Sequence, residues 1–316
     1  MKLNHLRDVL AIAERGSLRA AARSLGLAQP ALSRSVRELE RELGVALFER
    51  SARGVTLTES GKRFLGRAKA VRSELRRAHE ELDQLRGRGH GRVAMCLSTV
   101  AHIALLAPAL GPFRQRYPQV HLDVHDGLYP SAEPALKDGS LDCYIGPPPE
   151  ALPSEFAAEK LFDNTRVILC RKGHPLRNAR SLRELAKAEW ISTSLTYDAH
   201  AEIGPLFAQH GLPAPRFVMQ AHSALTFIVA VAYCDLLTMV PVQWLEFPLT
   251  RDVLQKIDVR EPLSAPPICI IQRAGLPLTP AAEYFCDMVR RAAGHLASRR
   301  NADADGGRRG RGVRPR

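Results

Sequence analysis

The N-terminal part of the chain repeats apolar positions at steps of three and four and breaks the pattern at glycines. This periodicity predicts helices over 3–15 and 18–25 and a third helix that starts near Gln29. Gly16 and Gly26 stand between them, since glycine readily takes the left-handed backbone that ends a helix. Three short helices in succession predict a small all-α domain.

The third predicted helix has two unlike faces. Its apolar side chains fall at steps of four, three and four and form a stripe that we expect to be buried: Leu32, Val36, Leu39 and Leu43. A second face presents polar groups beside a proline suited to a helix start: Gln29, Pro30, Ser33, Arg34 and Arg37. Amide, hydroxyl and guanidinium groups can read base edges in a major groove and pair with phosphates. We therefore interpret the second and third helices as a helix-turn-helix.

Residues 55–58 alternate apolar and polar side chains after Gly54, which predicts two short strands within 48–58 joined by a tight turn at this glycine. This wing would bring three side chains near the DNA backbone, and we add the residue that caps the second helix to the expected DNA contacts: Arg50, Arg53, Thr56 and Ser17. Residues 1–58 thus predict a DNA-binding domain. The alternative is an alanine-rich helical bundle whose exposed arginines are only solvated.

A single long helix is predicted after Thr58, since no proline interrupts the chain as far as Arg86. Its apolar residues recur at heptad spacing: Phe64, Ala68, Val71, Leu75, Ala78, Leu82 and Leu85. The other positions are mostly Arg, Lys and Glu, so this narrow stripe needs a partner helix. We predict a dimer seam over 59–88, followed by a glycine hinge. The alternative is that the stripe packs on the chain's own downstream domain.

The rest of the chain alternates strand and helix patterns. Residues 92–146 predict the order β-α-β-α-β, which implies parallel strands with right-handed crossovers. A similar set follows over 166–240, and a strand over 268–272 and a helix over 280–297 complete the domain. We predict an α/β domain of two lobes with a cleft between them. The expected boundaries are 91–297 for the domain, about 91–162 and 266–297 for lobe I, about 163–265 for lobe II, and 298–316 for a disordered tail rich in Arg and Gly.

Ligands of open α/β sheets bind beyond the carboxyl ends of the strands, often where a helix starts. In this chain those places carry hydroxyl and backbone N–H groups that suit a small anion. We expect the ligand to contact Ser98, Thr99, Val100, Tyr129, Pro147, Thr193, Ser194, His222 and Ser223. For each Ser or Thr, simple helix capping remains the alternative.

Charge is distributed unevenly within a formal total of +12. The first 90 residues hold 19 Lys and Arg against 11 Asp and Glu, and residues 298–316 hold seven Arg and two Asp. A basic head on a near-neutral body favours double-stranded DNA as a partner. The basic tail is interpreted as a solvated end, with a weak nonspecific nucleic-acid contact as the alternative.

Several classes of protein are disfavoured. The six cysteines form no CxxC pair, which favours reduced thiols in a cytoplasmic protein. No signal peptide is recognisable, and the most apolar stretch, 224–237, is too short to cross a bilayer. Motifs such as HExxH, GxSxG and GxxxxGK[ST] do not occur. We therefore expect no enzyme, no cofactor, no metal site and no membrane partner.

Local motifs at fixed places resemble the LysR-type transcriptional regulators. In the N-terminal third they are residues 16–22, 29–33 and 47–50 with Leu57, Thr58 and Gly61; downstream they are Tyr117-Pro118, Leu141-Asp142 and 173–176. The resemblance covers about residues 1–297. It implies a winged helix-turn-helix, a linker-helix dimer, usually a tetramer of two dimers, and a periplasmic-binding-protein-like effector domain. Residues 126–130 and 235–238 are also similar to the family member that responds to toluenesulfonate.

The resemblance also implies roles and partners. The polar face of the third helix would enter the major groove, and Ser98, Thr99 and Thr193 would lie at an inducer cleft. The implied partners are an inverted-repeat operator, a small-molecule effector and further copies of the chain, with RNA polymerase as a candidate. The chain departs from the family at Ala28, where a hydroxyl residue often caps the recognition helix.

We therefore predict a sequence-specific transcriptional regulator whose activity responds to a small anionic or aromatic acid bound between the lobes. The first alternative is an architectural DNA-binding protein that needs no ligand. The second is an enzyme that uses the cleft for catalysis.

Overall fold

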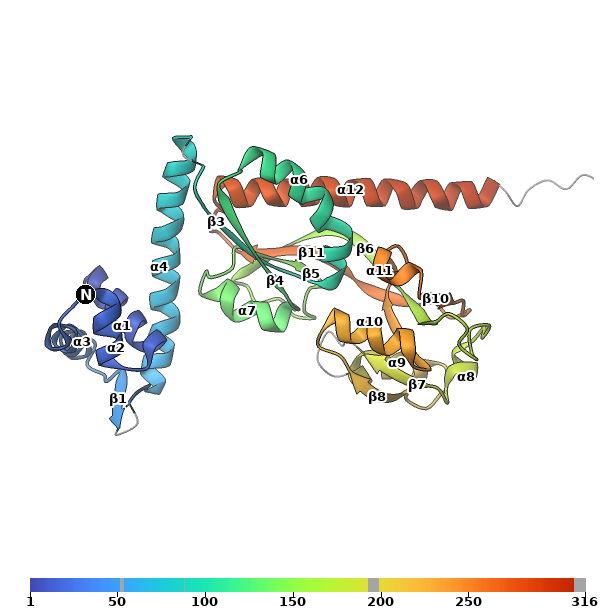
Figure 1. The fold of residues 1–316 in the computed structure, drawn as a ribbon, viewed down its shortest axis with the longest axis horizontal. Helices are drawn as coiled ribbons and strands as arrows, with labels where there is room; N and C mark the ends of the chain where they lie inside the picture. Colours follow the sequence, from blue (N-terminus) through green and yellow to red (C-terminus); the bar gives the residue numbers. More distant parts are fainter. Residues whose placement is uncertain (52–53, 88, 193–198, 310–316) are drawn as a thin grey trace, which may run out of the picture.

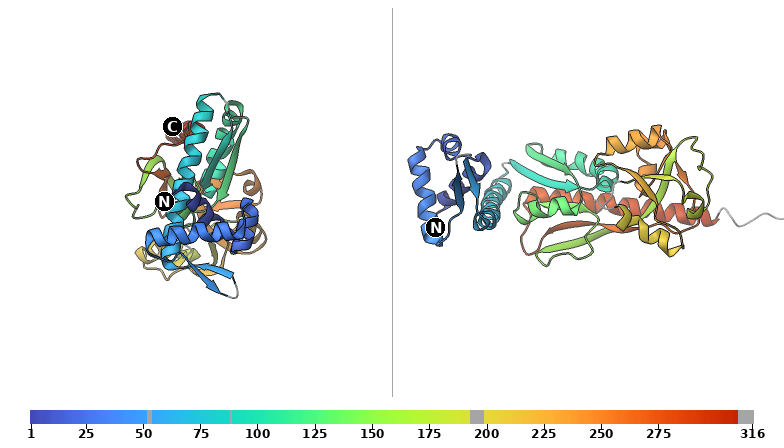
Figure 2. Two further views of the ribbon diagram at one scale, coloured as in Figure 1. Left: turned by 90° about the vertical axis from the view of Figure 1, so that its left-hand side faces the viewer. Right: turned by 90° about the horizontal axis from the view of Figure 1, so that it is seen from below.

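The computed structural model of the protein describes residues 1–51, 54–87, 89–192 and 199–309 (Figure 1). A small N-terminal domain and a two-lobed α/β domain lie on opposite sides of one long helix (Figures 1 and 2). In the part of the chain that is described, no helix is long and apolar enough to cross a membrane.

The N-terminal domain consists of the predicted three helices and a wing. Its elements are α1 (Leu3–Arg15), α2 (Leu18–Leu25), α3 (Gln29–Leu43), β1 (Phe48–Ser51) and β2 (Gly54–Leu57). Gly16 and Gly26 end α1 and α2 with φ of 65° and 66°, the left-handed conformation that the sequence predicts. The apolar stripe of α3 is buried against α1 and α2 through Leu32, Val36 and Leu39. The prediction was wrong for Leu43, the last residue of the helix, which is 38% exposed.

Two polar side chains, Glu40 and Thr58, fix the wing and the next helix to this domain. The Glu40 carboxylate of α3 accepts hydrogen bonds from the backbone N–H groups of Leu47 (2.8 Å) and Phe48 (3.2 Å), where the wing starts. The Thr58 hydroxyl accepts from Gly61 N–H (2.9 Å) and donates to the Ala46 carbonyl (2.7 Å), so it caps the linker helix and holds its start. The recognition helix, wing and linker helix are therefore positioned together.

The linker helix α4 (Glu59–Leu85) docks on the α/β domain along one face. The buried guanidinium of Arg77 binds Asp142 (2.8 Å) and the carbonyl of Leu141 (3.1 Å), and the Ser73 hydroxyl donates to the Asp138 carbonyl (3.1 Å). Near the end of α4, the Gln84 amide oxygen accepts from Ala281 N–H (2.9 Å).

Lobe I starts with three strands that are parallel, as predicted, and lie in the spatial order β4-β3-β5. They are β3 (Gly91–Leu97), β4 (Val120–Asp126) and β5 (Cys143–Gly146), with α7 (Tyr129–Lys137) between the last two. The connection after β3, expected to be one helix, is divided into α5 (Thr99–Ala101), a π-helical turn (His102–Leu106) and α6 (Ala107–Arg116). Pro108 cannot donate to the carbonyl four residues before it, which favours a wider turn at this place.

Two long strands connect the lobes. The chain leaves lobe I along β6 (Phe156–Arg171) and returns along β11 (Ser264–Arg273), and the two pair antiparallel. The sequence predicted only residues 166–171 and 268–272 of these strands. The missing part of β6 is mostly exposed, with no apolar alternation, and pairing with β11 makes it a strand.

Lobe II repeats the parallel arrangement around strands β7, β8 and β9. Its elements are α8 (Leu182–Leu185), β7 (Glu189–Ser192), α9 (Ala199–Gln209), β8 (Arg216–Gln220), α10 (Ala224–Tyr233), β9 (Leu236–Pro241), the 3₁₀ turn Val242–Leu245, α11 (Pro248–Arg251) and β10 (Leu254–Ile257). The 3₁₀ turn, α11 and β10 were not predicted. Among the described residues, one sheet joins both lobes in the order β4-β3-β5-β11-β6-β9-β7-β8, with β10 on β6.

The last helix, α12 (Pro280–Arg309), corrects one expectation. It covers lobe I, where Phe285 meets Phe113 edge to face at 5.6 Å. The sequence predicted a helix over 280–297 and a disordered tail over 298–316, yet the helix continues to Arg309 and extends beyond the domain (Figure 1). Alanines and arginines in this stretch are good helix formers, which outweighs the glycines near its end.

Candidate DNA-binding surface and ligand cavity

The outer face of α3 presents most of the side chains that the sequence assigned to DNA. Gln29, Pro30, Arg34 and Arg37 are exposed, while Leu32, Val36 and Leu39 lie beneath them in the core. Arg37 donates from Nε to the Ser33 carbonyl (3.2 Å), which holds its guanidinium close to the helix surface. Ala28 precedes the helix without a side-chain cap, as the sequence indicated.

Ser33 is an exception. We expected it on the exposed face, but its side chain is 8% exposed, and its hydroxyl accepts from Arg37 Nη2 at 3.3 Å. Position 33 lies between the polar face and the buried stripe, where a small side chain is covered by its neighbours. Ser33 therefore supports Arg37 from below and does not present a free hydroxyl.

The other expected DNA contacts surround α3. Ser17 caps α2 by accepting from Ala20 N–H at 3.4 Å, and Thr56 is exposed on β2. Arg50 lies on β1 opposite Val55 in the antiparallel pair. Arg53 lies outside the residues that the structure describes.

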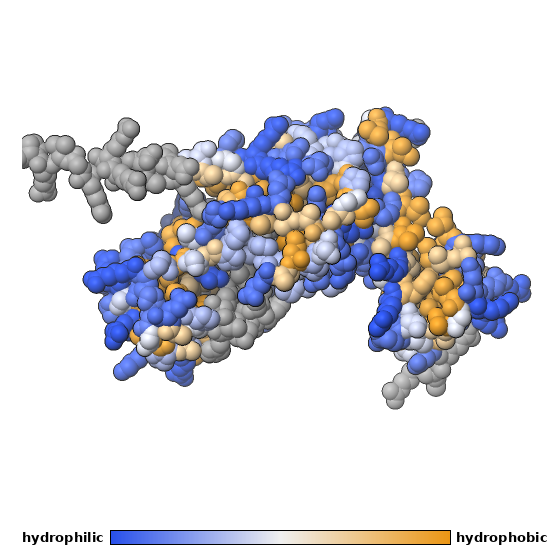
Figure 3. Space-filling view, turned by 180° about the vertical axis from the view of Figure 1, so that it is seen from behind, coloured by the Kyte–Doolittle hydropathy of each residue, from blue (hydrophilic) through white to orange (hydrophobic). Residues whose placement is uncertain are grey.

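The residues of the expected dimer seam on α4 fall into two groups, one exposed and one in contact with the N-terminal domain. Val71, Leu75, Ala78, Leu82 and Leu85 are exposed, the last two to 54% and 70%. They follow the spacing 4, 3, 4, 3 on a face that the α/β domain leaves uncovered, and hydrophobic residues gather over α4 in the rear view (Figure 3). An apolar row of this length in water favours a partner helix.

The first two residues of the expected seam contact the N-terminal domain of their own chain. Ala68 is buried against Leu6 and Leu10 of α1, and Phe64 packs on the core of the N-terminal domain. The heptad spacing includes Phe64 and Ala68 because the same face of α4 first packs against α1 and is then exposed to solvent from Val71 onward. Spacing alone could not distinguish a contact within the chain from a contact between chains.

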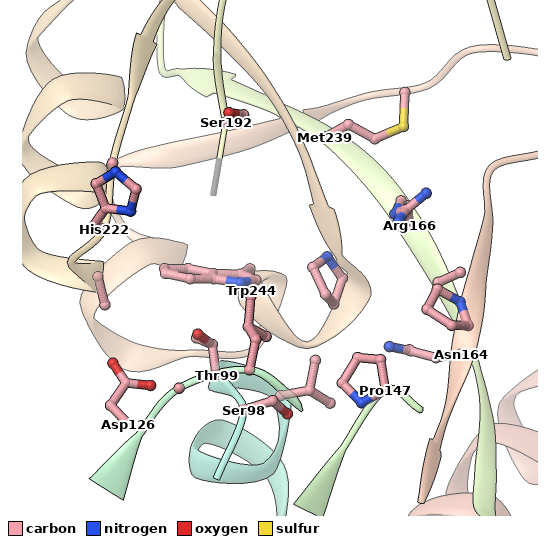
Figure 4. A pocket seen from close by; sticks show the side chains of 18 of the residues that line it. Ser98, Thr99, Asp126, Pro147, Asn164, Arg166, Ser192, His222, Met239 and Trp244 are labelled. Carbon is pink, nitrogen blue, oxygen red and sulfur yellow. The ribbon is translucent and has the colours of Figure 1, made fainter. Parts of the chain in front are cut away.

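A cavity of about 300 Å³ lies between the two lobes (Figure 4). Lobe I contributes the loops after β3, β4 and β5, and lobe II contributes the end of β7, the loop after β8, and β9. Ser98, Thr99, Val100, Pro147, His222 and Ser223 all line it, as the strand-end argument predicted.

Of the other expected ligand residues, one lies elsewhere and two fall outside the part of the chain that the structure describes. Tyr129 is buried away from the cavity, edge to face with Tyr144 (5.9 Å) and Phe156 (6.1 Å). As the first residue of α7 it turns its large ring into the core of lobe I, so its assignment was wrong. Thr193 and Ser194 lie outside the described residues.

Sequence reasoning missed several residues of the cavity wall. Asp126 ends β4, Asn164 and Arg166 lie on β6, and Trp244 follows β9. Asp126 could have been found, since it ends a predicted strand. The others come from the crossing strand and from a turn that no local pattern marked.

The polar groups of the wall differ in their surroundings. Asn164 Oδ1 accepts from the Gln243 amide at 2.9 Å in a buried pair. The hydroxyl of Ser192, a 4% exposed residue, has no hydrogen-bond partner among the described residues. Burial, with a smaller effect of Asp126, raises the pKa of the nearby Cys96 thiol to about 12. That thiol remains protonated at neutral pH and is a poor nucleophile.

Two families match the chain, and together they cover most of it. Residues 3–62 match the family described as "Bacterial regulatory helix-turn-helix protein, lysR family", and residues 86–294 match "LysR substrate binding domain". The chain belongs to the LysR family. This LysR protein is a DNA-binding transcriptional regulator with a substrate-binding domain, and the cavity lies within that domain.

Relatives and solved structures agree with this assignment. The "RuBisCO operon transcriptional regulator" of Allochromatium vinosum is 31% identical over 304 residues, 95% of this LysR chain and 99% of its own. The crystal structure of HinK from Pseudomonas aeruginosa is similar with a TM-score of 0.56 and 25% identity, over 93% of this chain and 99% of that one. Full-length CbnR, solved with its target DNA, has a TM-score of 0.65 at 20% identity, over 92% and 100% of the two chains, which establishes the shared fold.

Proposed function

We propose that this LysR regulator reads an inverted-repeat operator through α3, and that a small ligand between the lobes sets its effect on transcription. The observation that carries the DNA assignment is the row of exposed polar side chains on α3 above the buried side chains of Leu32, Val36 and Leu39. Arg34 and Arg37 reach the base edges, while Arg50, Arg53, Thr56 and Ser17 position the wing and the start of α2 on phosphates.

Self-association is the second part of the proposal. Two copies pair through the exposed row on α4, which presents two recognition helices to the two half-sites of the operator. A tetramer of two such dimers spans a longer operator. RNA polymerase is the partner through which the bound regulator would alter transcription, and the cytoplasm is where chromosomal DNA and polymerase meet.

The third part concerns the ligand. Hydroxyl groups at strand ends, Arg166, and the ring of Trp244 suit a small aromatic acid, either a carboxylate or a sulfonate. The local similarity of residues 126–130 and 235–238 to the toluenesulfonate-responsive regulator supports the same class. Binding would stabilise one arrangement of the lobes and so change the spacing or bend of the bound DNA.

The DNA assignment is tested with Arg34→Ala and Arg37→Ala. Each variant should lose about 1–3 kcal/mol of operator binding, because each removes a group aimed at bases or phosphates. Footprinting and binding titrations measure this loss. Arg183→Ala, on α8 of lobe II, removes the same charge from an exposed residue and should bind normally. Unchanged footprints for both α3 variants would refute the assignment.

The ligand assignment is tested by thermal unfolding with a set of small aromatic and aliphatic acids. A true ligand at 100 times its Kd stabilises the folded protein by about 2.7 kcal/mol. It should also change the footprint. If no compound alters either, the architectural DNA-binding alternative is favoured, and turnover of a bound compound would favour the enzyme alternative.

A further inference from the structure

The wall of the cavity carries opposite charges at its two ends. Asp126 comes from the end of β4 in lobe I, and Arg166 comes from β6 where that strand enters lobe II. Figure 4 shows the two side chains on opposite sides of the cavity, with Trp244 and Thr99 between them. A ligand that fills the cavity therefore meets a cation at one end and an anion at the other.

Arg166 can bind an anionic group in addition to its contacts within the protein. Its Nη1 donates to the Ser264 carbonyl at 3.4 Å, and Arg166 has at least one further interaction within the protein. A guanidinium carries five N–H donors, so it can bind several groups at once. The Ser192 hydroxyl, which lacks a partner among the described residues, adds a buried polar group to the lobe II side of the wall. Leaving such a group unpaired costs free energy, which a ligand can recover.

Asp126 limits which anions can bind. Its side chain is 61% exposed, and it lies 3.9 Å from His102 Nδ1. That nitrogen lies closer to the Ser98 carbonyl (3.1 Å), to which it donates, since a carbonyl can only accept. The Asp126 carboxylate thus keeps its acceptor capacity toward the cavity. It repels a ligand with anionic groups at both ends and favours one with a hydrogen-bond donor there.

The cavity wall also has an apolar part. Trp244, Met239 and Pro147 contribute to it, and Trp244 packs on Phe227 with ring centroids 4.7 Å apart. A volume of about 300 Å³ is at the lower end for small-molecule sites and accommodates a compound with a single ring.

We infer that the regulatory ligand is bipolar: a single flat ring with a carboxylate or sulfonate at the Arg166 end and an ammonium or hydroxyl donor at the Asp126 end. This inference rests on the proposed function of the cavity as the ligand site. It narrows the ligand from an aromatic acid to one with a donor opposite its acid group.

Four para-substituted benzoates test it by calorimetry on the full-length protein. They carry a methyl, a hydroxyl, an aminomethyl or a second carboxylate group opposite the acid. Affinity should rise from the dicarboxylate through the methyl and hydroxyl compounds to the aminomethyl compound. The aminomethyl compound should bind about tenfold or more tightly than the methyl compound, since it makes a charge-assisted hydrogen bond.

Two variants test which cavity residue binds which end of the ligand. Asp126→Asn should reduce the preference for aminomethyl over methyl to about twofold or less, and it should improve binding of the dicarboxylate. Arg166→Gln should weaken all four compounds by a similar factor. Glu150→Gln removes an exposed carboxylate that does not line the cavity, and it should leave the ranking as in the wild type.

The outcomes separate this inference from the function on which it rests. If the methyl or dicarboxylate compound binds as tightly as the aminomethyl compound, or Asp126→Asn leaves the ranking unchanged, the bipolar ligand is refuted while the ligand site stands. A ligand from outside this series is judged by the same Asp126→Asn comparison. If nothing in a broad set of acids and neutral compounds binds, both proposals fail.

Discussion

Gly61 illustrates how closely single residues join the wing to the linker helix. A Cβ at this position would lie 2.0 Å from the Leu47 carbonyl oxygen, which is backbone and cannot turn away. Gly61→Ala should therefore destabilise the N-terminal domain by about 3 kcal/mol through overpacking. Urea unfolding followed by circular dichroism measures the loss.

The same helix supplies the control. A Cβ at Gly66 would meet no atom within 4 Å, so Gly66→Ala should stabilise the protein by about 0.5–1 kcal/mol through helix propensity alone. If both alanine variants were equally stable, the close approach at Gly61 would have no energetic role.

At this scale the sequence identified residues whose role depends on local spacing. Arg34 and Arg37 face outward because helix periodicity places them opposite Leu32 and Leu39. Ser33 and Tyr129 were misjudged, since their burial depends on neighbours that periodicity does not describe. Nor could Arg166 be linked to the cavity from sequence, because its strand is positioned by pairing with β11 and β9.

Among the elements, α4 has two distinct faces. The exposed row is predicted to form the dimer, so Leu75→Glu combined with Leu82→Glu should convert the protein to monomers by placing charges in the seam. Analytical ultracentrifugation measures this. Leu249→Glu, at a 65% exposed position on α11, makes the same change elsewhere and should leave the association state intact. A dimer that survives the double variant would move the interface away from α4.

The opposite face of α4 depends on Arg77. Burial lowers the pKa of Arg77, and the charge of Asp142 opposes this shift. Arg77→Met leaves the Asp142 carboxylate buried without its cation, and it should lower the free energy of unfolding by about 3–5 kcal/mol. Arg63→Met breaks an exposed pair with Glu59 and should cost less than about 1 kcal/mol. Chemical denaturation compares the two, and equal losses would contradict the buried pair's importance.

Some helices and strands are determined by the local sequence, and others depend on contacts with distant parts of the chain. The three N-terminal helices and the parallel strands of both lobes follow from periodicity, capping and glycine positions, and the sequence predicted them. The long strands β6 and β11 depend on pairing with each other, and they lie about 100 residues apart in the chain, so no short window of the sequence contains that information. The π-helical turn accompanies Pro108, which is a local signal, but the turn itself was not predicted.

At the scale of the whole molecule, the position of α12 bears on whether its basic end contacts DNA. Figure 1 shows this helix leaving the α/β domain on the side opposite the N-terminal domain. We expect truncation after Ala297 to leave operator affinity within about twofold and its dependence on salt unchanged, because α3 and the wing supply the phosphate contacts. Titrations at several salt concentrations test this. A slope reduced by about 0.9 per lost contact would instead assign the tail to DNA.

The paired crossing strands make lobe II an insertion within lobe I. Thr165 stands opposite Ser264 in the antiparallel register, and Arg166 N–H donates to the Leu263 carbonyl at 2.9 Å, so the two ends of the inserted segment are adjacent. Segments with neighbouring ends can be exchanged without rebuilding the host. Chimeras that receive this segment from another regulator should keep their operator while acquiring half of a foreign recognition pocket, which offers a modular route to new biosensors.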